Sequence, residues 1–240
     1  MKLFLISLLV FSAAAWAQNA VPAGTVLPAE MTASLDSGKS KTGQVITARI
    51  MQDVPLPAGR IPAGARIVGH IVGVAPAKNG SGMEISLQFD TLRFSHRSIP
   101  ITTNLRAWAS MAEVEDAQVP STGTDRGTTF ASMTTNQIGG EVVYGQGGPV
   151  TNGSDFVGHA APGGVLVRIS AKPGSGCSGE GDDRLQALWL FSSNACGPYG
   201  FPGLEITHAG RTNPIGQIRI ASRRGRLRIQ GGSGLLLRVR

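Results

Sequence analysis

Apolar residues occupy every second position from Met83 to Phe89, and polar residues fill the positions between them. A period of two places the apolar side chains on one face of a β-strand and the polar ones on the other. The pattern then slips by one residue, because Leu92 and Phe94 continue on the opposite count. An extra residue in one strand of a sheet causes such a slip. We therefore expect a half-buried strand with a β-bulge at residues 90–91.

The tripeptide Pro-Ala-Gly recurs at 22–24, 57–59 and 62–64, each time after an aliphatic residue. Proline at the second and glycine at the fourth position suit a type I β-turn, and the residue before proline is pushed toward extended backbone. Glycine occurs 33 times and proline 14 times in 240 residues, whereas aromatic residues make up only 5%. Many short strands joined by tight turns fit this composition better than long helices do.

A polar segment at 111–136 separates two stretches that carry strand patterns. It is acidic at first and then rich in serine, threonine and glycine. We expect an all-β protein with little helix, made of two small β-barrel or sandwich domains that this polar linker joins. The first domain spans 18–110, and the second, a glycine-rich β domain with one disulfide, spans 137–240.

Two patterns in the second domain predict local structure. The run at 185–191 is almost continuously apolar, which fits a strand buried on both faces, with a short helix as the alternative. The short apolar segments 218–220 and 227–229 flank Arg223-Arg224-Gly225, so we expect them to form a β-hairpin around that turn.

The first 17 residues contain the three parts of a secretory signal peptide. Lys2 supplies a positive start, residues 3–11 form an apolar segment, and Ala15-Trp16-Ala17 matches a small-x-small cleavage site. We therefore expect cleavage after residue 17 and a mature protein that is secreted or periplasmic. No apolar run reaches the roughly 18–20 residues that a membrane helix needs, so we expect no membrane-spanning segment after cleavage.

The chain has two cysteines, Cys177 and Cys196. In an oxidising compartment an isolated pair of this kind predicts one disulfide, which would stabilise the fold by about 3 kcal/mol. The alternative is a metal site that also uses His159 or His208. Two widely spaced cysteines without a C-x-x-C pair are a poor fit to such a site, so we expect no metal.

The chain after Glu205 contains no acidic residue but many arginines. Arginine binds phosphate and carboxylate groups through paired hydrogen bonds, so we expect a basic face whose partner is an envelope protein or an anionic envelope polymer. Nucleic acid is not expected, because no aromatic residues are interleaved for base stacking. The alternative is a solvated strand face whose charges prevent edge aggregation. The predicted binding residues are Arg219, Arg223, Arg224, Arg226 and Arg228, and the remaining arginines after Glu205 are Arg211, Arg238 and Arg240.

No cofactor is expected from the sequence motifs. Residues 174–179 match G-x-G-x-x-G, but the acidic residues that follow do not begin an apolar helix, as a dinucleotide site requires. Glu180, Asp182 and Asp183 offer oxygen ligands for Ca²⁺, although one short acidic cluster is a weak signal. The four histidines form neither H-E-x-x-H nor a close pair, and no G-x-S-x-G elbow occurs.

These observations favour a non-enzymatic secreted or periplasmic envelope protein that acts as a binding or scaffold module. Two alternatives stay open: a carbohydrate- or peptidoglycan-binding module, and a hydrolase whose catalytic triad assembles from distant residues. Trp108 is the better candidate for an exposed aromatic residue, whereas Trp189 lies within an apolar run and is expected in the core. The sequence leaves the oligomeric state open.

Four motifs in the first half occur together in one order: a Pro-Ala-Gly start at 22–24, a Ser-x-x-Gly turn at 40–43, Ile-Pro-Ala-Gly at 61–64 followed by Gly69, and the strand pattern of 83–94. With these motifs, residues 21–105 resemble the β-barrel domain of the envelope-spanning channel scaffold of conjugal-transfer and type IV secretion systems. The resemblance implies a β-barrel fold and an envelope location. The second half is similar instead to the C-terminal regions of uncharacterised secreted bacterial proteins.

Overall fold

The computed structural model describes residues 20–78, 80–119, 134–144, 147–170 and 181–240. Within them the regular secondary structure is almost all β-strand, with one helix, α1 (Met111–Gln118), so the all-β prediction is confirmed. The strands are β1 (Val26–Met31), β2 (Leu35–Asp36), β3 (Val45–Ile50), β4 (Val54–Leu56), β5 (Gly59–Ile61), β6 (Arg66–Pro76), β7 (Met83–Phe94), β8 (Arg97–Pro100), β9 (Thr103–Ala109), β10 (Thr134–Asn136), β11 (Val142–Tyr144), β12 (Pro149–Asn152), β13 (Asp155–Ala161), β14 (Gly164–Ile169), β15 (Asp182–Ala187), β16 (Gly197–Tyr199), β17 (Leu204–Ala209), β18 (Gln217–Ser222), β19 (Arg228–Ile229) and β20 (Gly234–Val239).

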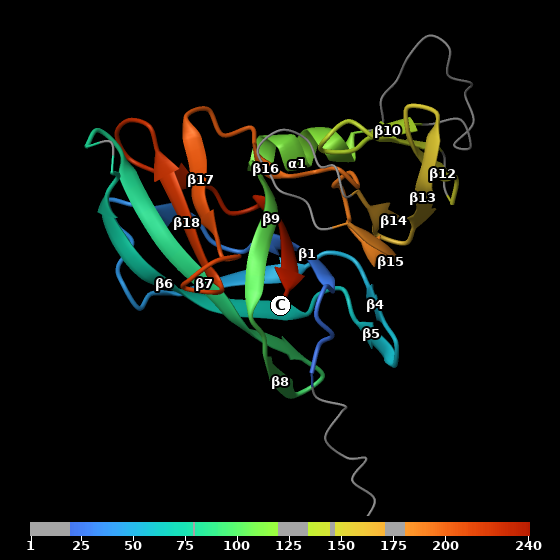
Figure 1. Cartoon of the computed structure of the whole chain (residues 1–240), viewed down its shortest axis with the longest axis horizontal. Coiled ribbons are helices and arrows are strands. Elements are labelled where there is room, and N and C mark those ends of the chain that lie inside the picture. The colour runs from blue at the N-terminus through green and yellow to red at the C-terminus, as the bar shows by residue number, and fades with distance from the viewer. Residues whose placement is uncertain (1–19, 79, 120–133, 145–146, 171–180) are drawn as a thin grey trace, which may run out of the picture.

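Ten of these strands form one strongly curved sheet (Figure 1). Its order is β16-β9-β20-β1-β3-β6-β7-β18-β17, and β8 pairs with β7. All neighbouring strands are antiparallel except β16 and β9, which run parallel. The sheet curls into a nearly closed barrel. A second sheet of six strands follows the chain order from β10 to β15, and two short ribbons pair β4 with β5 and β2 with β19.

The long strand β7 contains the β-bulge that the alternating pattern predicts. Opposite it on β6, Val68 pairs with Thr91 and the next residue, Gly69, pairs with Phe89, so Asp90 is the extra residue. The Asp90 carbonyl instead accepts a hydrogen bond of 2.9 Å from the N–H of Ile101. The bulge changes which face the later side chains occupy, and this is why the apolar count slips after Phe89.

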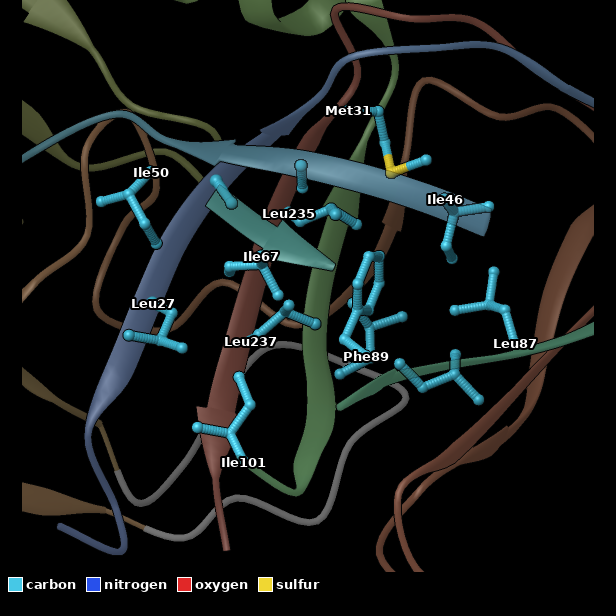
Figure 2. Packing of buried hydrophobic residues seen from close by; sticks show 14 of the residues in the cluster. Leu27, Met31, Ile46, Ile50, Ile67, Leu87, Phe89, Ile101, Leu235 and Leu237 are labelled. Atoms are coloured by element: carbon cyan, nitrogen blue, oxygen red, sulfur yellow. The ribbon is translucent and has the colours of Figure 1, made fainter. Parts of the chain in front are cut away.

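The barrel core consists mainly of aliphatic side chains, together with Trp108 and with Phe89, which is fully buried (Figure 2). Leu27 of β1, Leu87 of β7 and Leu237 of β20 point into the same core, so strands from both ends of the chain contribute to it (Figure 2). The period-two pattern of each strand puts one face into this core.

The outer face of β1, β9 and β20 is buried as well. Val26, Ala107 and Leu236 belong to a second apolar cluster, together with Val114 of α1 and residues of the six-stranded sheet. This covering explains why all seven residues of β9 are buried. A strand that is covered on both faces does not show the usual alternation of apolar and polar residues.

The sheets do not follow the predicted division into 18–110 and 137–240. Strands β16, β17, β18 and β20 lie in the second range, but they belong to the same ten-stranded sheet as the strands of the first range. The C-terminal strand β20 pairs with β1 on one side and β9 on the other. The barrel is therefore completed by the end of the chain.

The predicted strand at 185–191 and the predicted hairpin around 223–225 are both wrong. Strand β15 ends at Ala187, and the chain turns at Trp189, whose side chain is buried as expected but whose φ is 53°. Strand β18 pairs with β7 and β17, whereas β19 pairs with β2. The apolar residues of β18 face those of β7, with Ile220 opposite Ile85, so burial in the barrel decides this pairing.

The predicted linker begins with ordered helix. In α1, the Ser110 side chain accepts a hydrogen bond from the N–H of Glu113, and Val114 and Ala117 are buried. Serine at the residue before a helix satisfies one of the unpaired N–H groups of the first turn. Residues 120–133 of the linker lie outside the described residues. In the part of the chain that the structure describes, no helix has the length and apolar character needed to cross a membrane.

The Pro-Ala-Gly turns differ from the predicted type I geometry. The N–H of Thr25 donates to the carbonyl of Pro22 (3.2 Å), and the N–H of Ala65 donates to that of Pro62 (3.1 Å). Proline is therefore the first residue of each turn, and glycine is the third, with φ of 84° at Gly24 and 86° at Gly64. A positive φ at the third position is the type II geometry, for which glycine is the usual residue.

Candidate functional site

Four of the five predicted binding arginines line one cavity of about 760 Å³. The cavity is formed by the start of α1, the connection between β16 and β17, and the chain from the end of β18 to the residue before β20. In Figure 1 the start of β17 and the helix lie at the same end of the barrel. We call this cavity of about 760 Å³ the arginine cavity. Its lining residues are 110–112, 200–204, Ser222, Arg223, Arg224, Arg226, Arg228, Gln230 and Ser233.

Two carboxylates hold three of these arginines in place. Arg223 Nε lies 2.7 Å from Glu205 Oε1. Asp36 binds two arginines, because its Oδ1 lies 3.0 Å from an Arg226 terminal nitrogen and its Oδ2 lies 3.5 Å from Arg228 Nε. Such exposed pairs add at most about 1 kcal/mol each to stability, so their main effect is on the position of the guanidinium groups.

The Asp36 carboxylate is kept ionised by its surroundings. The backbone N–H of Gly38 donates to it over 2.9 Å. This hydrogen bond, with the nearby charges of Arg226 and Arg228, lowers the pKa of Asp36 below its ordinary value despite a smaller opposing effect of desolvation. Asp36 therefore stays negative and holds both arginines at neutral pH.

Arg224 is the arginine of the cavity without a carboxylate. Its side chain is exposed, and no hydrogen bond or ion pair joins it to any other residue that the structure describes. The four guanidinium groups outnumber the nearby carboxylates of Asp36, Glu205 and Glu113, so the cavity carries a net positive charge. An open, positively charged cavity of this kind attracts anions.

Arg219, the fifth predicted residue, lies at a different place. It lines a separate cavity of about 230 Å³ together with Lys78, Glu84 and Glu205. Its Nε is buried and has no hydrogen-bond partner among the described residues. The predicted basic face is therefore divided, with Arg223, Arg224, Arg226 and Arg228 at the arginine cavity and Arg219 outside it.

Sequence reasoning missed the rest of the cavity. Asp36 binds arginines about 190 positions away in the sequence, and this contact follows from the pairing of β2 with β19. The start of α1 falls in the segment 111–136 that was interpreted as a linker, and Ser110 is the last residue of the predicted first domain. The N-cap pattern of Ser110 followed by Glu113 was the signal that could have located this helix.

A buried polar cluster lies elsewhere in the molecule. The carboxylate of Glu141, which is 1% exposed, accepts hydrogen bonds from the backbone N–H of Ser193 (2.8 Å) and from its hydroxyl. The carbonyl of Ser193 accepts from the buried guanidinium of Arg106 on β9 (2.9 Å). The same guanidinium donates to the carbonyl of Ala195 (3.1 Å). Burial raises the pKa of Glu141 above its ordinary value, against the hydrogen bonds from Ser193, which lower it.

The Glu141→Gln variant is expected to become more stable relative to the wild type as the pH rises above 4.5, the ordinary pKa of this carboxyl. The wild-type carboxyl is neutral in the folded protein below that pH, and its stabilising contribution is lost as the pH rises through its raised pKa in the folded state. Urea unfolding of both proteins at a series of pH values measures the difference in the free energy of unfolding. A difference that does not change with pH would contradict the expectation.

Several predicted features lie outside the described residues. They are the signal peptide, Cys177, the G-x-G-x-x-G segment and Glu180. Cys196 is described and is buried, but the predicted disulfide stays a prediction. Asp182, one of the Ca²⁺ candidates, accepts from an Arg184 terminal nitrogen at 2.8 Å, which lowers the pKa of Asp182. Among the described residues no three histidine, cysteine or acidic side chains group as metal ligands do.

The histidines and Trp108 are the described side chains that bear on the two alternative functions. All four histidines are described and none is buried; His70 Nδ1 lies 2.9 Å from Asp90 Oδ2, and His208 contacts Thr212 at 3.2 Å. Trp108 is only 1% exposed, so the prediction of an exposed aromatic at this position is wrong. Its strand is covered on both faces, and the ring packs into the barrel core.

Comparisons with protein-family models and with curated proteins found no match to this chain.

Proposed function

We propose that this protein is a non-enzymatic binding or scaffold module of the cell envelope, exported by its signal peptide, and that the arginine cavity holds an anionic group of its partner. The observation that carries the proposal is the convergence of four arginines, at one end of the barrel, around a cavity large enough for a side chain or a polymer segment. The partner is an envelope protein or an anionic envelope polymer.

The arrangement of charges supports binding rather than simple solvation of the surface. Arg226 and Arg228 are both directed by Asp36, and Arg223 is directed by Glu205. A guanidinium group that is already positioned loses less side-chain entropy when an anion binds. Arg224 remains available to pair with an incoming phosphate or carboxylate group.

Export and the disulfide belong to the same proposal. The predicted signal peptide would deliver the protein to an oxidising compartment, where Cys177 and Cys196 would form one disulfide. Thiol titration of the denatured mature protein without reductant tests this part. We expect no free thiol, and two titratable thiols would contradict the proposed disulfide.

The Arg224→Glu variant is expected to bind anionic polymers about tenfold more weakly than the wild type, because it replaces the unpaired positive charge with a negative one. The measurement is fluorescence anisotropy of labelled polyglutamate and labelled polyphosphate at low ionic strength. Wild-type binding should also weaken as salt is added, because exposed charges are screened.

The matched control is Arg97→Glu, which makes the same charge change on β8, at the opposite end of the barrel from α1 (Figure 1). We expect this control to bind like the wild type. Equal losses in the two variants, or no binding of either polymer by the wild type, would refute the proposed function. If the protein sediments with purified peptidoglycan, and if Arg224→Glu does not change the amount that sediments, the saccharide-binding alternative is favoured.

A further inference from the structure

The first turn of α1 contributes hydrogen-bond donors to the arginine cavity. Ser110, Met111 and Ala112 all line it. The N–H of Glu113 donates to the Ser110 side chain (3.3 Å) and the N–H of Val114 to the Ser110 carbonyl (3.1 Å). The N–H groups of Met111 and Ala112 have no hydrogen-bond partner among the described residues. Such free N–H groups at a helix start, together with the helix dipole, favour an anion.

Ser233 is a second and independent observation at the same cavity. It lines the cavity, its residue is 0% exposed, and its hydroxyl has no hydrogen-bond partner among the described residues. A buried hydroxyl without a partner costs about 1–3 kcal/mol. The unsatisfied Ser233 hydroxyl therefore indicates that a ligand supplies the missing hydrogen-bond acceptor.

The backbone around Ser233 lies directly against the start of α1. A Cβ at Gly232 would lie 3.0 Å from Met111 Cγ, and one at Gly234 would lie 2.9 Å from a methyl group of Val114. Ser233, between these two glycines, is therefore next to the first turn of the helix. Glu113, the acidic residue of that turn, lies close to Gly200. A Cβ at Gly200 would be 3.1 Å from Glu113 Oε1.

We infer that the arginine cavity is a phosphate-binding site, in which the start of α1 and the Ser233 hydroxyl act together with Arg224 and Arg228. This inference rests on the proposed function and names its ligand class. A phosphate group presents three or four acceptor oxygens in a tetrahedral arrangement, whereas a carboxylate presents two in one plane. Backbone N–H groups, a hydroxyl and guanidinium groups that surround one cavity from different elements fit the tetrahedral group better.

The phosphate could be free inorganic phosphate or the headgroup of a phospholipid, and both present the same chemistry to the cavity. The two sources differ in what else must bind. A headgroup brings a membrane surface to the arginines, whereas the free ion needs the cavity alone.

The Ser233→Ala variant provides the sharpest test. Alanine fits the space of serine, and the hydroxyl that it removes makes no hydrogen bond within the described residues, so the variant should fold at least as stably as the wild type. Isothermal titration with inorganic phosphate should show affinity about fivefold lower for Ser233→Ala and about tenfold lower for Arg224→Ala. Arg97→Ala is the control and should bind phosphate like the wild type.

Titration with acetate separates this inference from the proposed function. We expect acetate to bind at least about tenfold more weakly than phosphate. Equal affinities for the two ions, or equal phosphate affinities of Ser233→Ala and the wild type, would overturn the inference. If the phosphate result fails but Arg224→Glu still weakens polyglutamate binding, the proposed function survives without the phosphate inference. If Arg224→Glu also leaves polyglutamate binding unchanged, the proposed function is refuted as well.

Vesicles of phosphatidylglycerol distinguish the two sources of phosphate. A lipid headgroup is supported if the wild type sediments with the vesicles, if inorganic phosphate reverses this sedimentation, and if Ser233→Ala weakens it. Phosphate binding in the titration without sedimentation supports the free ion. Sedimentation that neither phosphate nor Ser233→Ala affects would show that the vesicles bind elsewhere and would count against a headgroup in the cavity.

Discussion

A protein that lacks residues 231–240 is expected to show no cooperative unfolding transition. The deletion removes β20, which lies between β1 and β9 and pairs with both. It also removes Leu235 and Leu237 from the barrel core and Leu236 from the second apolar cluster, and all three side chains are fully buried. Truncation of one buried leucine to alanine costs about 2–5 kcal/mol, and a domain is stable by only about 5–15 kcal/mol.

Urea unfolding followed by circular dichroism measures this effect. The matched control removes only Arg240, which lies after the end of β20, and it should keep a cooperative transition close to that of the wild type. The same dependence applies to a fragment of residues 18–110, because its barrel strands would lack β18 and β20. A cooperative transition in the protein without residues 231–240 would show that the barrel folds without its C-terminal strand.

The Arg106→Met variant is expected to lose about 3–5 kcal/mol of unfolding free energy. Methionine keeps much of the apolar stem, but it leaves the carbonyls of Ser193 and Ala195 without the donors that now reach them at 2.9 and 3.1 Å. Arg106 is only 3% exposed, so water cannot easily replace these hydrogen bonds. The loop that contains Ser193 also carries the partners of Glu141, and its loosening would expose that carboxyl.

Thermal and urea unfolding of Arg106→Met measure the loss, and Arg97→Met is the control. Arg97 is exposed on β8, so its replacement should change the free energy of unfolding by no more than about 0.5 kcal/mol. Equal stabilities of the two variants would mean that the buried guanidinium is not needed to hold the loop to β9. In the double variant Arg106→Met/Glu141→Gln the two changes in the free energy of unfolding should not add, because both groups bind Ser193.

Features that depend on a few neighbouring residues were predictable from the sequence. The alternation before Phe89 and its slip afterwards predicted both the strand and the bulge at Asp90, because the period of side chains along a strand is a local property. The same is true of the burial of Trp189 within an apolar run. The turn at Pro22 was predicted with proline as its second residue, but proline is the first residue. The composition of a turn does not decide which residue comes first.

Partners that lie far apart in the sequence were not predictable. The arginines around residue 224 were recognised as a basic group, but the expected hairpin would have left them on a simple turn. The structure instead separates β18 from β19 and pairs β19 with β2, which brings Asp36 to Arg226 and Arg228. Likewise, nothing local to Ser233 indicates that the first turn of α1 lies against it.

The sequence by itself determined the all-β class, the position and bulge of strand β7 and the accumulation of positive charge near the C-terminus, because periodicity, turn residues and charge are properties of short segments. Only the tertiary structure decided that β20 completes the barrel with β1 and β9, and that four arginines, a helix start and a buried hydroxyl surround one cavity. Strand pairing over such separations is selected by the burial of apolar faces against one another, and that selection depends on the whole chain at once.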